Sequence, residues 1–122
     1  METDRMKKPV VLRIYKGDQL LGVKQFLESQ IVVGRQGDVQ VALEGESVSV
    51  IHAVIEERDS GHYVCDLGSE KGTLRNGEPV LDSPIASGDI LQIGDYRLEF
   101  YLGVPKPKAP PPGMAPKVPS GQ

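Results

Sequence analysis

Short apolar segments separated by tight-turn residues limit what this chain can fold into. These segments cover residues 10–15, 20–27, 31–33, 39–43, 52–56, 62–66, 73–75, 78–80, 90–93 and 96–102. Among the turns, Asn76-Gly77 is the strongest hairpin signal, and Pro79 favours an edge position for the strand that follows. Residues 9–104 hold 13 Val, 7 Ile and 11 Leu but only 3 Ala, which favours strands over helices. The pattern predicts an all-β fold, a sandwich or a barrel.

The composition divides the chain into three parts. Residues 9–104 carry eight basic and fifteen acidic residues, whereas residues 105–122 carry three lysines, no acid and seven of the ten prolines. We predict a flexible N-terminus over 1–8, a folded domain over 9–104 and a disordered Pro/Lys-rich linker or tail over 105–122. A ligand for a proline-binding groove is the alternative interpretation of the tail. A linker joins two folded parts, but this one ends at Gln122 with no second domain after it. We therefore expect the chain to be a fragment of a longer protein.

Composition also argues against several functional classes. The net charge of -3 argues against nucleic-acid binding through bulk charge. The single cysteine, Cys65, has no partner for a disulfide or a metal cluster, and its place in a predicted strand favours a small buried residue over a nucleophile. The chain has no apolar run of membrane length, and the acids Glu2 and Asp4, with no long apolar segment after them, lead us to expect no secretory leader. We therefore expect a cytoplasmic protein with no metal and no cofactor.

The residues with the most distinctive chemistry lie where predicted strands end. They form four segments: Gly34-Arg35, residues 49–52, residues 69–73 and Asn76-Gly77. Together these segments offer a planar guanidinium, hydroxyl groups and backbone N–H groups beside glycines, which let a backbone approach a ligand closely. This combination is suited to binding a small anion on loops that are held by a rigid scaffold.

The order of these segments resembles that of the forkhead-associated (FHA) domain. The resemblance covers residues 31–102 and rests on these motifs in order: Gly34-Arg35, Ser49-x-x-His52, Asp66-Leu67-Gly68-Ser69-x-x-Gly72-Thr73, Asn76-Gly77 and Ser87-Gly88-Asp89-Ile90-x-x-Ile93-Gly94. The resemblance implies a β-sandwich of about eleven short strands. It also implies binding of phosphothreonine peptides through the loops at one end of the sandwich.

The resemblance assigns a role to each of nine residues. Arg35 is expected to bind the phosphate, and the Ser49 hydroxyl is expected to donate a hydrogen bond to a phosphate oxygen. Ser69, Lys71 and Asn76 complete the predicted phosphopeptide-binding set. The alternative for Ser69 is a structural role in the loop, and the alternative for Asn76 is a place in a type I′ turn. The residues expected to support the site are Gly34, His52, Gly72 and Gly77.

Three positions depart from the family pattern. Val50 and Ile51 are apolar, so neither side chain can contact a phosphate through a polar group. Lys71 stands where the family has an asparagine that fixes the loop and contacts the peptide main chain. A lysine offers a point charge instead of an amide that both donates and accepts. Lys71 is therefore either a second cation near the phosphate or a mark of altered binding.

By resemblance, the chain is a phosphothreonine-dependent protein-interaction module and not an enzyme. The resemblance places it at the N-terminus of a larger bacterial signalling, envelope or motility protein, cytoplasmic itself or the cytoplasmic part of a membrane-anchored protein. Its expected partner is a phosphothreonine-containing protein, with a Ser/Thr kinase implied indirectly, and we expect a monomer that contacts neither nucleic acid nor membrane. The alternative is a phosphate-independent interaction or scaffold domain. Ser49, His52 and Asp66 are the residue types of a hydrolase triad, but no Gly-x-Ser-x-Gly motif surrounds Ser49.

Overall fold

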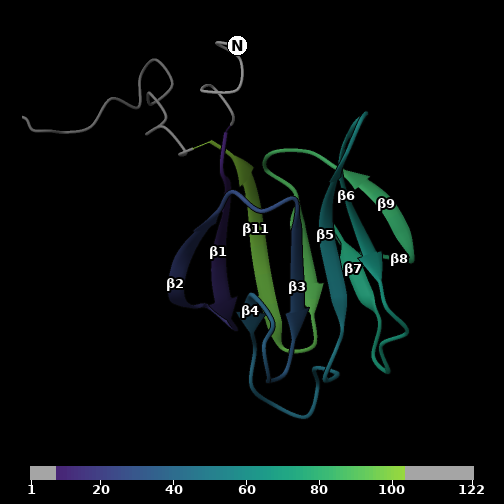
Figure 1. Cartoon of the computed structure of the whole chain (residues 1–122). Coiled ribbons are helices and arrows are strands. Elements are labelled where there is room, and N and C mark those ends of the chain that lie inside the picture. Colours follow the sequence, from purple (N-terminus) through teal and green to yellow (C-terminus); the bar gives the residue numbers. More distant parts are fainter. Residues whose placement is uncertain (1–7, 104–122) are drawn as a thin grey trace, which may run out of the picture.

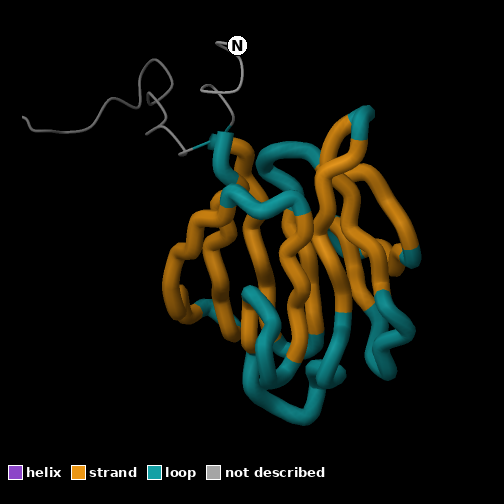
Figure 2. Tube along the Cα trace, in the orientation of Figure 1, coloured by secondary structure: helices purple, strands orange, loops and turns teal. Residues whose placement is uncertain are grey.

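The structure, a computed structural model, describes residues 8–103. The predictions for the N-terminal segment up to residue 7 and for the tail over 105–122 lie outside the described residues. Within 8–103 there are eleven strands and no helix (Figures 1 and 2), so the all-β prediction is confirmed. The strands are β1 (Val10–Lys16), β2 (Gln19–Phe26), β3 (Gln30–Gly34), β4 (Val41–Ala42), β5 (Ala53–Arg58), β6 (Gly61–Asp66), β7 (Thr73–Arg75), β8 (Glu78–Val80), β9 (Asp82–Ile85), β10 (Ile90–Ile93) and β11 (Tyr96–Leu102).

The strands form two sheets that face each other in a sandwich (Figure 1). One sheet has six strands in the order β2-β1-β11-β10-β7-β8, and the other has five in the order β4-β3-β5-β6-β9. All neighbouring pairs are antiparallel except β3 and β4, which run parallel over two residue pairs. Because β1 pairs with β11 along its whole length, the two ends of the folded domain lie side by side.

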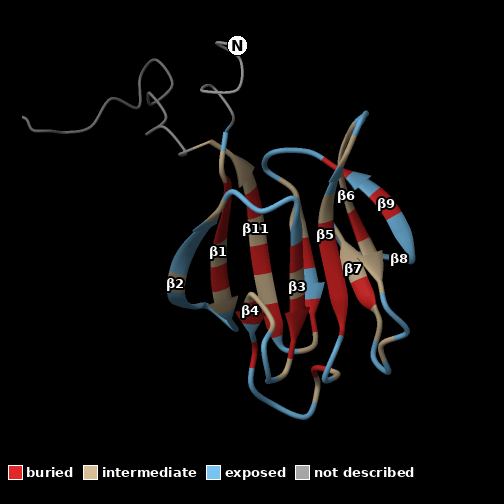
Figure 3. Cartoon of the chain, viewed as in Figure 1, coloured by how far each residue is buried: buried red, intermediate tan, exposed pale blue. Residues whose placement is uncertain are grey.

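The core lies between the sheets and is built from alternate residues of each strand. In β1 the inward positions are Val10, Leu12 and Ile14, and in β11 they include Leu98 and Phe100. The other sheet contributes a matching set: Ile31, Val33, Ala53, Ile55 and Val64. Figure 3 shows this alternation as red bands along the central strands, while the edge strand β2 is pale blue. The period-two alternation is what one buried face of a strand requires.

The turn between β7 and β8 agrees with the hairpin predicted from Asn76-Gly77. Asn76 has a φ of 50° and Gly77 a φ of 90°, as a type I′ turn requires at its two central residues. The strands pair in register with Arg75 opposite Glu78. β8 is the last strand of its sheet, as predicted from Pro79, because proline has no N–H to offer a further neighbour.

Two strands differ from the prediction. β9 was not predicted, because Asp82 and Pro84 both disfavour strands; it forms as the edge strand beside β6, where proline is tolerated. The alternating segment over 39–43 was predicted as one strand, but only Val41 and Ala42 pair with β3. Val41 and Leu43 are buried, whereas Val39 is only partly buried. A bend in the loop therefore replaces the regular strand there.

Candidate functional site

Strand register places the ends of three neighbouring strands at the same end of the sandwich. Val33, near the end of β3, is opposite Ala53, the first residue of β5. Ala53 in turn is opposite Asp66, the last residue of β6. The loops that follow β3 and β6 and the loop that precedes β5 therefore meet at one end, the lower end in Figure 2. Arg35, Ser49, Ser69 and Lys71 lie on these loops.

The end of β3 lies directly against the loop that precedes β5. The N–H of Arg35 donates to the carbonyl oxygens of Ser49 at 3.0 Å and Val50 at 3.1 Å. A Cβ on Gly34 would lie 2.0 Å from the carbonyl oxygen of Val50, a distance that no side chain can occupy. The glycine before Arg35 is therefore required by close backbone approach, and this contact fixes Arg35 beside Ser49.

The Ser49 hydroxyl connects two loops. Its oxygen accepts a hydrogen bond from the N–H of Glu70 at 3.0 Å. A hydroxyl has one hydrogen to donate and two lone pairs, so accepting this bond leaves the hydrogen free for another partner. Ser49 is partly buried and adjoins the backbone of Arg35. Its hydroxyl can thus donate to a ligand while it holds the loop after β6.

His52 is fully buried between the same two loops. Its Nδ1 accepts from the N–H of Ser49 at 3.1 Å, and its Nε2 lies 2.8 Å from the carbonyl oxygen of Gly72. A backbone N–H can only donate, so Nδ1 is the acceptor and Nε2 carries the hydrogen that Gly72 accepts. One neutral imidazole therefore links the loop before β5 to the loop after β6.

Asp66 is the centre of a hydrogen-bond network. The sequence motif that begins at Asp66 includes this residue, but no role in the site was predicted for it. Its carboxylate accepts from the N–H groups of Gly68 and Ser69 and from the hydroxyls of Ser69 at 2.5 Å and Thr73 at 2.7 Å. Burial raises the pKa of this carboxyl, but the hydrogen bonds from Ser69 and Thr73 outweigh burial and hold the pKa below its usual value. The available signal was the spacing of an Asp that caps its own turn.

Ser69 is engaged inside this network. Its hydroxyl donates to Asp66 and accepts from the N–H of Gly72 at 2.9 Å. Gly72 has a φ of 90°, so the chain turns back toward β7 in a conformation that favours glycine. The donor of Ser69 is therefore already used to shape the loop that carries Lys71.

Arg35 and Lys71 line one hollow at this end of the sandwich. Ser47, Glu46 and Glu70 complete its lining. Within residues 8–103, neither basic side chain makes a hydrogen bond or an ion pair. Two cations with free donors thus face the hollow, together with two carboxylates.

Asn76 and Gly77 lie elsewhere. They follow β7, whereas Gly72 precedes it, and three residues of strand span about 10 Å. The Asn76 side chain donates to Asp89 at 3.1 Å and accepts from the N–H of Ile90 at 2.9 Å. The structure therefore brings Arg35, Ser49 and Lys71 together but places Asn76 at the other end of β7, where it holds a turn.

The residue types of a hydrolase triad do not form one here. Both ring nitrogens of His52 are bound to backbone groups, and the Ser49 hydroxyl is bound to Glu70. The Asp66 carboxylate is bound to Ser69 and Thr73. A triad requires the histidine to lie between the hydroxyl and the carboxylate, so this geometry differs at every link.

A comparison with known families agrees with these motifs. The model of the FHA domain matches residues 31–94. The chain belongs to the FHA-domain family. The resemblance drawn from the motif order is confirmed, and β1, β2 and β11 add strands on either side of the matched segment of this FHA domain.

Individual relatives extend the comparison. The glycogen accumulation regulator GarA of Mycobacterium tuberculosis is 38% identical over 96 residues, covering 71% of this chain and 59% of GarA. A solved FHA domain from a study of phosphothreonine-dependent FHA interactions has 27% identity and a TM-score of 0.69, covering 80% of this chain and 99% of that one. The FhaA FHA domain, solved in complex with the intracellular domain of Rv3910, has 28% identity and a TM-score of 0.66, covering 75% and 98%. The chain thus spans about three fifths of GarA. No helix within residues 8–103 is long and apolar enough to cross a membrane.

Replacing Gly34 tests the close approach that fixes Arg35. We expect Gly34→Ala to lower the free energy of unfolding by about 1–3 kcal/mol, because the methyl group overlaps the carbonyl oxygen of Val50. Gly22→Ala is the matched control, since a Cβ there meets nothing within 4 Å. Urea unfolding measures both changes. Equal stability of the two variants would show that the backbone at Val50 leaves room for a side chain at position 34.

Acid titration tests the Asp66 network. Because the folded-state pKa of Asp66 lies below the unfolded value of about 3.9, its carboxylate stabilises the fold above that pH. This contribution is lost as the pH falls through the folded pKa. We expect the free energy of unfolding to decrease more steeply on acidification below about pH 4 in the wild type than in Asp66→Asn. Parallel pH profiles from urea unfolding would show that the network does not couple protonation to stability.

Proposed function

We propose that this chain is a phosphothreonine-dependent protein-interaction module. The observation that carries the proposal is the hollow in which the unpaired cations of Arg35 and Lys71 face the same space. Ser49 adjoins it with a hydroxyl hydrogen free to donate. A phosphate group carries a charge of about -1.5 to -2 at pH 7 and three strong acceptor oxygens, which suit a guanidinium, a hydroxyl and an ammonium.

In the proposed complex, each residue acts on a different part of the phosphate. The planar guanidinium of Arg35 can donate two parallel bonds to two oxygens, and Ser49 donates to a third. Lys71 adds a second positive charge, and we assign it this role in place of the family's asparagine. Ser69, His52, Gly34 and Gly72 position these groups without a bond to the ligand. Asn76 and Gly77 act as a turn outside the site.

The carboxylates around the hollow repel a phosphate, so its direct contacts must outweigh this repulsion. Glu46 and Glu70 line the same hollow as the two cations, and residues 9–104 carry a net charge of -7. Charges more than about 8 Å away are largely screened at physiological salt, so short contacts dominate over the distant acidic surface. The phosphate is therefore held by direct donors, and the overall field does not attract it.

Family membership supports the proposal. One similar FHA domain was solved for its phosphothreonine-dependent interactions, and another in complex with an intracellular domain. By analogy, the partner of this chain is a phosphothreonine-containing protein that a Ser/Thr kinase prepares, and the interaction takes place in the cytoplasm. The proposed activity is binding and not catalysis, because His52 is committed on both sides to backbone groups.

A phosphate-independent interaction is the second candidate. Val50, Ile51 and Leu67 lie at the same end of the sandwich with 44%, 46% and 43% of their surfaces exposed. Apolar side chains exposed beside a binding hollow are typical of protein contact surfaces. This observation gives a partner without phosphate something to bind.

Titration with matched peptides separates the two candidates. The probes are one peptide sequence bearing threonine, phosphothreonine or phosphoserine at its centre, titrated into the chain by calorimetry. We expect the phosphothreonine form to bind and the unmodified form to bind at least tenfold more weakly, because charge-assisted hydrogen bonds contribute about 1.5–3 kcal/mol each. Arg35→Ala should abolish measurable binding, and Lys71→Met should weaken it about fivefold.

A lysine outside the hollow serves as the control for these substitutions. Lys24→Met removes a cation from the edge strand β2, outside the hollow, and should leave the affinity unchanged. Equal binding of the phosphorylated and unmodified peptides would support the phosphate-independent candidate. Wild-type affinity in Arg35→Ala would show that the phosphate binds elsewhere on the domain.

A further inference from the structure

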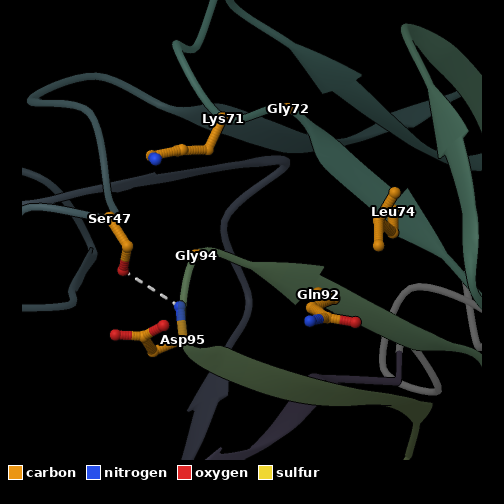
Figure 4. A pocket seen from close by; sticks show the side chains of 7 residues that line it. All are labelled: Ser47, Lys71, Gly72, Leu74, Gln92, Gly94 and Asp95. Atoms are coloured by element: carbon orange, nitrogen blue, oxygen red, sulfur yellow. Dashed lines mark hydrogen bonds between the residues drawn. The ribbon is translucent and has the colours of Figure 1, made fainter.

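A second hollow, whose lining residues are drawn in Figure 4, shares residues with the hollow that Arg35 lines. Ser47 and Lys71 line both hollows, so the two lie next to each other. Beyond them, the second hollow extends over Leu74 and Gln92 to Asp95. Leu74 on β7 and Gln92 on β10 are directly opposite each other in register, and both lie partly or fully exposed.

The turn that carries Asp95 is fixed against the loop that carries Ser47. The N–H of Asp95 donates to the Ser47 hydroxyl at 3.0 Å, as drawn in Figure 4. A Cβ on Gly94 would lie 2.5 Å from that hydroxyl and 2.6 Å from the Ser47 carbonyl oxygen. The turn between β10 and β11 therefore packs closely against Ser47, and this contact places Asp95 beside the hollow that Arg35 lines.

The charges of this second hollow differ from those of the first. Lys71 and Asp95 are its only charged lining residues, and within residues 8–103 the Asp95 carboxylate has no hydrogen bond or ion pair. When Lys71 faces a phosphate in the neighbouring hollow, its charge is neutralised there. What then remains is one free carboxylate, one amide from Gln92 and the apolar surface of Leu74.

This combination matches a long basic side chain. Lysine and arginine have an aliphatic stem, which packs on apolar surface, and a cationic head, which binds a carboxylate. Across the two hollows, the carboxylates of Glu46, Glu70 and Asp95 also outnumber the cations of Arg35 and Lys71. A bound phosphate increases this excess of negative charge, so a positive charge on the ligand offsets it.

We infer that the hollow lined by Leu74, Gln92 and Asp95 receives a lysine or arginine side chain from the same segment that carries the phosphothreonine. The inference rests on the proposed function, since the phosphate in the first hollow brings the basic side chain to the second. The preferred ligand of this domain is then a phosphothreonine segment with a basic residue nearby in sequence, and Asp95 is a specificity-determining residue.

A substitution scan of the ligand tests the inference. A phosphothreonine peptide with alanine at every flanking position is the reference, and each flanking position is replaced in turn by lysine, arginine or glutamate. We expect lysine or arginine at one position to tighten binding about fivefold over alanine and glutamate there to weaken it, because an ion pair with the exposed Asp95 carboxylate contributes modestly and a like charge repels it. In Asp95→Asn, the ratio of affinities for the lysine and alanine peptides should fall to about one.

The control variant separates a local contact from the general acidic field. Asp38→Asn removes the same charge at the same end of the sandwich, but Asp38 lines neither hollow. It should retain the lysine preference. Loss of the preference in both variants, or its survival in Asp95→Asn, would overturn the inference while leaving phosphate binding intact. Absence of any dependence on phosphate would overturn the proposed function and this inference with it.

Discussion

The loop end of this domain depends on a buried imidazole that is bound on both sides by backbone groups. His52 accepts from the N–H of Ser49 and donates to the carbonyl of Gly72, so the loop before β5 and the loop after β6 share one rigid link. A fully buried polar ring is costly unless both nitrogens are satisfied, and here both are. The Glu70 N–H bound to Ser49 adds a second link between the same loops. Arg35 and Lys71 are therefore presented by a preformed frame, which spares the ligand the entropy of ordering the loops.

The domain combines an acidic surface with a site suited to an anion. The cations of Arg35 and Lys71 line one hollow together with two carboxylates, and a third carboxylate, Asp95, lines the adjoining hollow. An isolated phosphate gains little from such a neighbourhood, whereas a phosphorylated segment with a basic side chain complements both signs. Complementarity of this kind contributes more to specificity than to raw affinity. In the proposed complex, the acidic residues select among phosphorylated partners, while Arg35 requires the phosphate itself.

The sequence predicted the parts of the structure that are determined locally. Turn pairs such as Asn76-Gly77 and alternating apolar residues located ten of the eleven strands, because both signals act within a few residues. β9 was not predicted because its Asp82 and Pro84 are tolerated in a strand only at the edge of a sheet. Edge position is a property of the whole sheet and cannot be inferred from local sequence. Motif order grouped Arg35, Ser49, Ser69 and Lys71, which the fold brings to one end of the sandwich, but it also included Asn76, which lies at the other end of β7. It could not show that Asn76 is held by Asp89 and Ile90, or that Ser47 fixes Asp95, since these bonds join segments that lie 13 to 48 residues apart. The bond from the Ser69 hydroxyl to Asp66 spans only three residues, but the choice of partner depends on the loop conformation.

Backbone amide chemical shifts during titration with a phosphothreonine peptide test the central claim most directly, because they locate the ligand residue by residue. We expect the largest phosphate-dependent changes at Arg35, Ser49 and Lys71, with little change at Asn76 and Gly77. The unmodified peptide should leave these amides unshifted. Changes centred on the turn between β7 and β8, or the same changes with both peptides, would contradict the assignment of the loop end as a phosphate site.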